Sequence, residues 1–382
     1  MTIFSKRVQQ IPPSGIRRFF DLVMAANDII SLGVGEPDFL TPWTIRDEAI
    51  YRIQKGATTY TANKGLLALR TAICAYVARH FNVTATPQEC LITSGVSEAV
   101  DILMRTLIDP DDAVILPEPI YVCYRPLIEL CGGVVTSIDT SQTAFTVTAA
   151  AIEAAITPKT KLIVLCSPNN PTGRSIPEAE LQAIAQLAIT HDLLIVSDDI
   201  YADLRFSPGS SIAAIPSVRD RVIYLNGFSK SHAMTGWRLG YMIAPEPIID
   251  MANKIHQYAA LCAPTIAQYA AIDACESADA DVARMRQSYK QRAQYFSHTM
   301  TELGLPTAMP DGGLYCFSSI QSLGMDAMTF AETLLAEQNV AIVPGHVFGA
   351  GGEGYIRSCV ATDMNQLKQA CAKIADFVRD HG

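Results

Sequence analysis

Six short apolar runs, rich in β-branched residues, recur through the middle of the chain. Segments with helical periodicity separate most of them; in the segment 177–192, Leu181, Ile184, Leu187 and Ala188 share one face. Continuous apolar runs are typical of strands buried on both faces, and their alternation with helices indicates a mostly parallel sheet covered on each side. The runs are "ECLIT" (89–93), "DAVILP" (112–117), "KLIVLC" (161–166), "LLIVS" (193–197), "RVIYLN" (221–226) and "GYMIA" (240–244). We therefore predict an α/β fold.

The last hundred residues follow a different pattern. A polar helical pattern over 280–300 precedes "GGLYCF", a helix over 328–338, and the apolar segments "VAIVPG" and "GYIRSCVA". This mixture predicts a smaller α+β domain, and 382 residues exceed one ordinary core. We expect an N-terminal segment (1–40) that packs with the small domain, a large α/β domain (41–278) and a small C-terminal domain (279–382).

Composition narrows the classes of partner. The formal net charge is -9 and no run of Lys or Arg interrupts it, so we expect neither nucleic acid nor an anionic membrane to bind. The ten cysteines show no CxxC pair, which favours reduced thiols. The first residues lack the apolar core of a signal peptide, and no segment approaches membrane-spanning length. We expect a cytoplasmic protein that acts on small molecules.

Polar clusters follow four of the apolar runs where each run ends. Ligands of open parallel sheets bind outside the carboxyl ends of the strands. The clusters are "SGVSEAV" after "CLIT", "SPNNPTG" after "LIVLC", "DDIY" after "LLIVS" and "GFSK" after "VIYLN". We therefore expect four segments that are distant in sequence to meet at one crevice.

Two of these clusters suit an anion and a reactive amine. Gly95 and Ser97 stand where a strand turns into a helix, whose free N–H groups favour phosphate, although a plain serine N-cap is the alternative. Lys230 follows a buried run, and desolvation would lower its pKa and make it nucleophilic. A solvated surface lysine is the common alternative. Arg238 has a planar donor fork that suits a phosphate dianion.

The other two clusters supply carboxylates and amides. Asp198 and Asp199 end a buried strand, where a carboxylate needs a cationic or proton-bearing partner such as a pyridinium nitrogen, a metal or an arginine. No accompanying histidine spacing is present, so a metal is the weaker interpretation. Two prolines and a glycine would fix the amides of Asn169 and Asn170, with a turn-forming role as the alternative.

Together the motifs resemble those of the class I/II pyridoxal-phosphate-dependent aminotransferases of fold type I. The resemblance runs from about residue 10 to the C-terminus, in the family's order, and is strongest to the prokaryotic aspartate/aromatic branch. The motifs are "LGVGEPDF" (32–39), "YTANKG" (60–65), "SPNNPTG", "SDDIY", "SKSHAMTGWRLGY" and "YIRSCVAT" (355–362). It implies pyridoxal 5'-phosphate as cofactor, no metal, and a homodimer with active sites at the subunit interface.

The resemblance also implies roles around the cofactor. Lys230 would bond to it covalently and then carry the proton that transamination moves, while Asp198 would keep the pyridine nitrogen protonated. Tyr201 and Asn170 would hydrogen-bond the phenolic oxygen of the ring, and Tyr121 would stack on the ring. Tyr60 would reach the phosphate of the neighbouring subunit. The phosphate would otherwise be held by Gly95, Val96, Ser97, Ser229 and Arg238.

On the substrate side, the resemblance assigns the α-carboxylate to Arg357, with Gly35 and Asn170 beside it. No clear equivalent exists of the second arginine that some relatives use for a dicarboxylate side chain. In "PPSGIRRFF", Ile16 suggests a partly apolar side-chain pocket, whereas Arg17 is placed to meet a distal carboxylate. Acidic, aromatic and N-acylated diamino-acid substrates therefore remain open.

The implied activity is transfer of an amino group from an L-amino acid of aspartate or aromatic type to a 2-oxo acid such as 2-oxoglutarate, by a ping-pong mechanism. The alternative on the same fold is a pyridoxal-phosphate-dependent carbon–sulfur β-lyase, because positioning after loss of the α-proton decides the outcome. A non-enzymatic regulatory protein is a third class, and the presence of Lys230, Asp198 and Arg238 argues against it.

Overall fold

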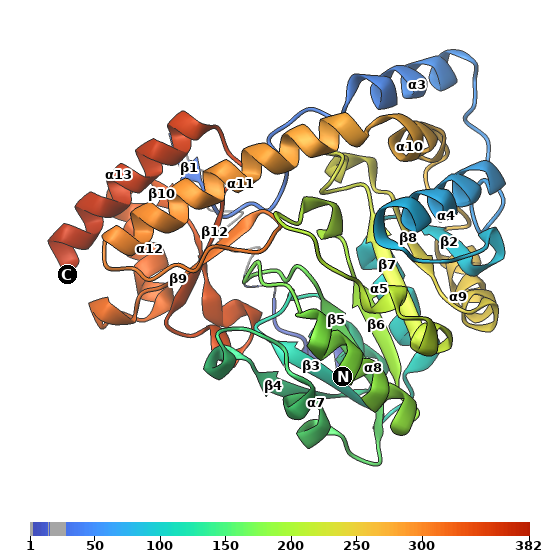
Figure 1. Cartoon of the computed structure of the whole chain (residues 1–382), viewed down its shortest axis with the longest axis horizontal. Helices are drawn as coiled ribbons and strands as arrows, with labels where there is room; N and C mark the ends of the chain where they lie inside the picture. The colour runs from blue at the N-terminus through green and yellow to red at the C-terminus, as the bar shows by residue number, and fades with distance from the viewer. Residues whose placement is uncertain (1–2, 14, 16–27) are drawn as a thin grey trace.

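The computed structural model describes residues 3–13, 15 and 28–382, so the predicted substrate residues Ile16 and Arg17 lie outside the described residues (Figure 1). Its largest sheet has seven strands in the order β2-β8-β7-β6-β5-β3-β4. Only β8 runs antiparallel to its neighbours in this sheet. The strands are β2 (Cys90–Thr93), β3 (Ala113–Glu118), β4 (Val134–Asp139), β5 (Thr160–Cys166), β6 (Leu194–Asp198), β7 (Val222–Gly227) and β8 (Gly240–Ile243).

Helices cover both faces of this sheet. Successive side chains of each strand point to opposite faces, and both faces carry apolar side chains that the helices bury. Val114 of β3 belongs to a core formed with one group of helices, and its neighbour Ile115 to a core formed with the other. The first group is α5 (Val96–Leu107), α6 (Tyr124–Cys131) and α9 (Glu246–Ala259). The second is α7 (Ala149–Ala155) and α8 (Glu178–Thr190). A further core joins Tyr224 of β7 and Tyr241 of β8 to α3 (Trp43–Gln54), α4 (Leu67–Phe81) and α10 (Thr265–Ser277). The α/β prediction is confirmed.

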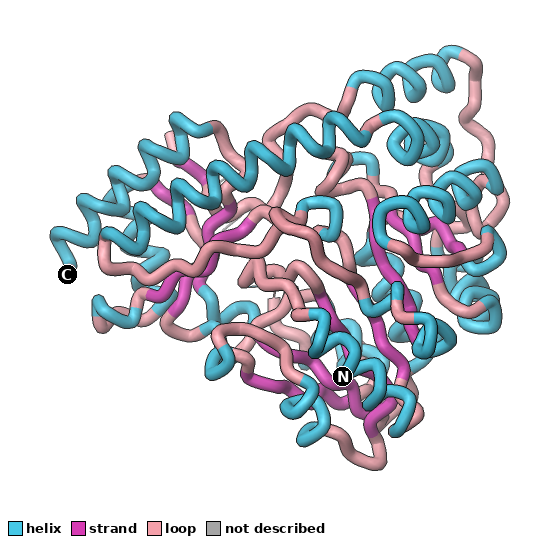
Figure 2. The backbone as a smooth tube through the Cα atoms, in the orientation of Figure 1, coloured by secondary structure: helices cyan, strands magenta, loops and turns pink. Residues whose placement is uncertain are grey.

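A second group of strands, separate from the large sheet, carries the C-terminal part of the chain (Figure 2). Its antiparallel sheet has the order β11-β12-β9. The strands are β9 (Tyr315–Ser319), β11 (Val343–Pro344) and β12 (Tyr355–Cys359). Its helices are α11 (Asp279–Glu302), α12 (Ala327–Gln338) and α13 (Met364–His381), which share one apolar core with these strands.

The N-terminal segment contacts both parts of the molecule. Strand β1 (Ile30–Ser31) pairs in parallel with β10 (Val340–Ala341) beside the small sheet. Helix α1 (Lys6–Gln10) lies against α6, where Arg7 Nη1 donates to the carbonyl of Leu130 at 3.1 Å. The domain limits 1–40, 41–278 and 279–382 stay a prediction. No helix in the described part of the chain is both long and apolar enough to cross a membrane.

The sheet order brings the polar segments together. Asp198 at the end of β6 pairs in register with Cys166 of β5 and with Leu225 of β7, so the three strands end side by side. Strand β8 begins at Gly240, where an added Cβ would lie 2.7 Å from backbone atoms of Gly95 and Val96. Glycine at this position therefore allows the start of α5 to approach the sheet.

This close approach predicts that Gly240→Ala destabilises the protein. The added Cβ would meet backbone, which cannot move without shifting α5, and overpacking of this kind costs about 1–3 kcal/mol. Gly236→Ala is the matched control, because no atom lies within 4 Å of an added Cβ there. Urea unfolding of the two apoproteins measures the difference. If Gly240→Ala is as stable as Gly236→Ala, the close packing is wrong.

Candidate active site

A cavity of about 530 Å³ lies where the strand ends of the large sheet face Tyr315 and Arg357 of the small sheet. It brings together nearly all the site residues predicted from the sequence. Those that line it are Gly35, Gly95, Val96, Ser97, Tyr121, Asn170, Asp198, Tyr201, Ser229, Lys230, Arg238 and Arg357. Tyr60 does not line it and is 79% exposed in the single chain. The four polar clusters therefore meet at one site, as expected.

Lys230 presents its amine to this cavity three residues after β7 ends. Its Nζ donates a hydrogen bond to the carbonyl of Gly35 at 2.5 Å. Burial, helped by the nearby charges of Arg357 and Arg238, lowers the pKa of Lys230 to about 8. A substantial fraction of the amine is therefore neutral, and able to attack a carbonyl, near neutral pH.

Asp198 is buried at the end of β6 and accepts two hydrogen bonds. Its Oδ2 accepts from the hydroxyl of Tyr124 at 2.5 Å, and its Oδ1 accepts from the Ile200 N–H at 3.1 Å. Burial raises the pKa of Asp198 to about 6, against the effect of these two donors. The sequence analysis did not identify Tyr124; its signal was its place three residues after Tyr121 in "YVCY".

The start of α5 and Arg238 form an anion cradle. Gly95 precedes the helix with a φ of 82°, a conformation that favours glycine, and the first N–H groups of a helix lack intrahelical partners. An added Cβ at Gly95 would lie 2.8 Å from Arg238 Nη2, so glycine also lets the guanidinium approach the helix. Arg238 donates to the carbonyls of Thr235 and Ser94 at 3.1 and 3.5 Å.

Arg357 enters the cavity from β12 and is only 2% exposed. Its Nη1 donates to Asn170 Oδ1 at 3.1 Å and its Nη2 to the carbonyl of Gly33 at 2.6 Å, while Nε has no hydrogen-bond partner. The guanidinium lies 4.4 Å from the ring centroid of Tyr315 and 4.9 Å from that of Phe348. Such a buried cation requires an anionic partner, and its fork suits a carboxylate.

Two tyrosines join the parts of the site. The hydroxyls of Tyr201 and Tyr315 lie 3.0 Å apart, and burial raises the pKa of both, so they remain protonated. An added Cβ at Gly35 would lie 2.0 Å from the Tyr315 hydroxyl, so only glycine fits there. The sequence analysis assigned "GGLYCF" to the small domain without recognising Tyr315 as a site residue.

The two asparagines of "SPNNPTG" differ in position. Asn170 faces the cavity, where its side-chain oxygen accepts from Arg357. Asn169 lies outside the cavity lining, and its side chain donates to the carbonyl of Pro119 at 2.9 Å and to Thr172 at 3.1 Å. The turn-forming alternative therefore describes Asn169.

Comparison with known proteins agrees with this geometry. The family model of the class I and II aminotransferases matches residues 27–374. The Bacillus subtilis (strain 168) protein YugH, named provisionally as an aminotransferase, is 46% identical over 98% of both chains. The aromatic-amino-acid aminotransferase 2 of Thermococcus litoralis is 36% identical over 98% of both chains. Aspartate aminotransferase from Thermus thermophilus, solved with maleate, superposes with a TM-score of 0.93 at 32% identity, covering 98% of this chain and 100% of the other.

The chain belongs to the class I and II aminotransferases, which depend on pyridoxal phosphate. The charges of the site fit this cofactor. Among the described residues, no carboxylate lies within ion-pair distance of Lys230, Arg238 or Arg357, and no cation lies within that distance of Asp198. The phosphate of the cofactor complements Arg238, and its aldehyde can react with the amine of Lys230. Its protonated ring nitrogen complements Asp198. Arg357 is left for a second anion.

The lowered pKa predicts how the reactivity of Lys230 depends on pH. In the apoenzyme, labelling of Lys230 by an amine-selective acylating reagent should rise about tenfold per pH unit at low pH and level off above pH 8, because only the neutral amine reacts. Peptide mass spectrometry measures the rate, with the exposed Lys55 as internal reference and Lys230→Ala as the blank. A labelling rate that still rises steadily above about pH 10 would contradict the pKa.

Proposed function

We propose that this aminotransferase moves an amino group from an L-amino acid of aspartate or aromatic type to a 2-oxo acid such as 2-oxoglutarate, in a ping-pong cycle. The observation that carries the proposal is the position of Arg357, a buried guanidinium that faces the same cavity as Lys230. An amino acid bound to Arg357 through its α-carboxylate brings its amine into that cavity. The names of the Thermococcus and Thermus relatives support aromatic and aspartate donors.

In the proposed reaction, the residues of the cavity have different roles. Pyridoxal phosphate supplies, when bound, an aldehyde that combines with amines and a ring that accepts electrons. Asp198 would hold a proton on the ring nitrogen, and Arg238 with the start of α5 would bind the phosphate. Lys230, whose pKa of about 8 lies near working pH, would take and return the proton at the substrate's α-carbon. Arg357 would fix the α-carboxylate so that this carbon lies within reach of the amine.

The walls of the cavity favour an aromatic or apolar side chain over a second carboxylate. Tyr121, Ile200 and Tyr315 line it, and each of its described cations already has a partner in the scheme above. An acidic donor would need another cation, for which Arg17, outside the described residues, is the candidate in this chain. Aromatic donors are therefore the first choice and aspartate the second.

We also propose a cytoplasmic homodimer. Large apolar side chains are exposed along α3 and at Tyr60, Tyr258 and Leu261, a pattern typical of a covered interface. They include Leu40, Trp43, Ile50, Tyr51, Ile53, Tyr60, Tyr258 and Leu261. Tyr60, which does not reach the cavity of its own chain, would contribute to the neighbouring one.

A donor screen tests the activity. With 2-oxoglutarate as acceptor, phenylalanine and tyrosine should form glutamate with a kcat/KM at least roughly tenfold above that of alanine, because the aromatic walls bury their rings. Aspartate is measured in parallel, and Lys230→Ala should form no glutamate with any donor. Release of pyruvate and ammonia from cystathionine, without glutamate formation, would instead identify the β-lyase. Full turnover by Lys230→Ala would refute the assigned roles.

Replacement of Arg357 tests the carboxylate site separately. Arg357→Lys removes the planar fork, and loss of a buried charged hydrogen-bonded pair costs about 2 kcal/mol or more, which is roughly thirtyfold in kcat/KM for every donor. Steady-state kinetics with phenylalanine and aspartate measure the change. Arg284→Lys, at an exposed position of α11, is the control. An unchanged kcat/KM in Arg357→Lys would rule out Arg357 as the carboxylate-binding residue.

A further inference from the structure

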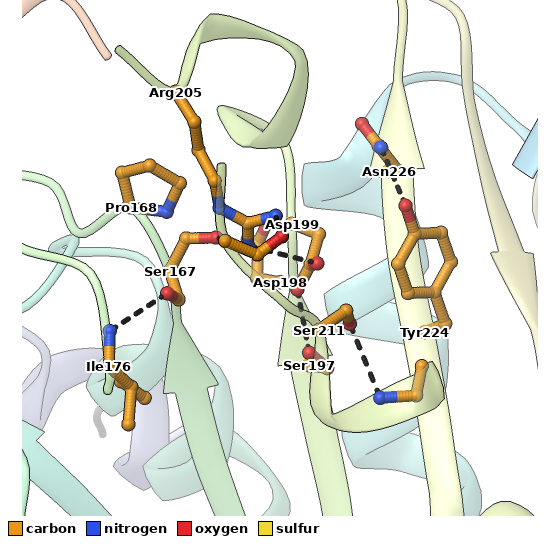
Figure 3. Close-up of polar contacts among 12 residues, drawn as sticks. Ser167, Pro168, Ile176, Ser197, Asp198, Asp199, Arg205, Ser211, Tyr224 and Asn226 are labelled. Atoms are coloured by element: carbon orange, nitrogen blue, oxygen red, sulfur yellow. Dashed lines mark hydrogen bonds and ion pairs between the residues drawn. The ribbon is translucent and has the colours of Figure 1, made fainter. Parts of the chain in front are cut away.

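Asp199 lies directly after Asp198 but belongs to a different environment. Asp198 lines the cavity, whereas Asp199 is 1% exposed and does not line it. Its Oδ1 accepts from the Ser197 hydroxyl at 2.6 Å, and its Oδ2 lies 3.6 Å from Arg205 Nη2 without a hydrogen bond (Figure 3). Two adjacent buried carboxylates are therefore present, one facing the cofactor site and one facing an arginine.

Arg205 is itself buried behind the site. Its Nη2 donates to the carbonyl of Ser167 at 3.0 Å, directly after β5, and its Nη1 donates to the carbonyl of Gly209 at 3.5 Å. The backbone of Arg205 also pairs with that of Gly312 in an isolated β-bridge. The guanidinium thus lies beside the ends of β5 and β6 (Figure 3), and Arg205 does not line the cavity.

The two buried carboxylates, Asp198 and Asp199, need a positive charge nearby, and Arg205 supplies it. Burial raises the pKa of both carboxylates; the negative charge of Asp199 adds to the rise at Asp198, whereas the positive charge of Arg205 opposes the rise at Asp199. Among the described residues, Arg205 is the one cation within ion-pair distance of either carboxylate. The other titratable groups that interact with the two carboxylates or with Arg205 are Tyr124 and Cys123 from the α6 region, Cys166 of β5, Asp203 and Tyr224 of β7.

None of those other groups can replace the arginine. Tyrosine, cysteine and aspartate side chains are neutral or negative in either protonation state, so none of them supplies a positive charge; burial raises the pKa of each and favours its neutral form. Removing one member of a buried ion pair leaves the other charge uncompensated, whereas replacing both members by neutral groups is often nearly neutral. Without that cation, the repulsion between the two carboxylates would favour protonation of one of them.

We propose that Arg205 is a positioning residue for cofactor binding: it balances the charge of Asp199, so that Asp198 stays ionised toward the ring nitrogen of pyridoxal phosphate. Arg205 acts through Asp199 and does not line the cofactor cavity. The inference rests on the proposed role of Asp198. It predicts that a variant without Arg205 loses affinity for pyridoxal phosphate, that this loss depends on pH, and that it disappears when Asp199 is neutralised as well.

The test compares Arg205→Met with the double variant Asp199→Asn/Arg205→Met. The dissociation constant of pyridoxal phosphate from each apoenzyme is measured at about pH 6 and about pH 8, as a ratio to the wild type. For Arg205→Met we expect a rise of roughly tenfold at the lower pH and less at the higher, because the pKa of Asp198 moves up from about 6 and its protonated form cannot pair with the ring nitrogen. The dissociation constant of the double variant should lie within roughly threefold of the wild-type value at both pH values.

A merely structural role gives a different result. Both variants lose the hydrogen bond to Ser167, so if that bond were the function of Arg205, both would bind weakly and equally at the two pH values. That outcome overturns the proposal, as does wild-type affinity in Arg205→Met. If Arg205→Met is insoluble, Arg205→Lys and the double variant decide, and a double variant that binds roughly tenfold more weakly refutes it. Asp198→Asn is the reference variant. If it binds pyridoxal phosphate as tightly as the wild type does, the role of Asp198 itself is refuted.

Discussion

The buried carboxylate of Asp198 is the feature on which the site depends. A charge at the end of a strand inside the sheet is costly unless donors and a cation satisfy it. The Tyr124 hydroxyl and the Ile200 N–H supply the donors, and the described protein supplies no cation. We propose that a protonated ring nitrogen meets the remaining demand, so that the site is balanced electrostatically only with its cofactor bound.

The two sheets contribute opposite parts of the chemistry. The large sheet provides Asp198 and Lys230 at its strand ends, and the small sheet provides Arg357 and Tyr315. Two close approaches around the site need glycine: a side chain at Gly35 would overlap the Tyr315 hydroxyl of the small sheet, and one at Gly240 of the large sheet would overlap the backbone at the start of α5. Glycine at these positions lets groups that are distant in sequence share a cavity.

Apolar patterns predicted the sheet because its central strands are buried on both faces, as "LIVLC" and "VIYLN" indicate. Strand β4 lacked that signal, since its edge position leaves Val134 half exposed and none of its six residues is fully buried. Tyr124 and Tyr315 were missed for another reason: their contacts join residues 74 and 114 positions apart, and a tyrosine in an apolar segment has no local mark of such a partner. The pairing of Arg205 with Asp199 likewise depends on burial, which the five intervening residues do not reveal.

Positive charge in the cavity meets two requirements at once. Arg238 and Arg357 are placed to hold a phosphate and a carboxylate, and the same two charges help to lower the pKa of Lys230. Burial is the largest cause of that lowered pKa, and the two cations add to it, so that more of the amine is neutral and able to attack a carbonyl near neutral pH. Moving either arginine would therefore alter both anion binding and the nucleophile. This coupling explains why "SKSHAMTGWRLG" carries its lysine and arginine in one short segment, with Arg357 brought to them from the other sheet.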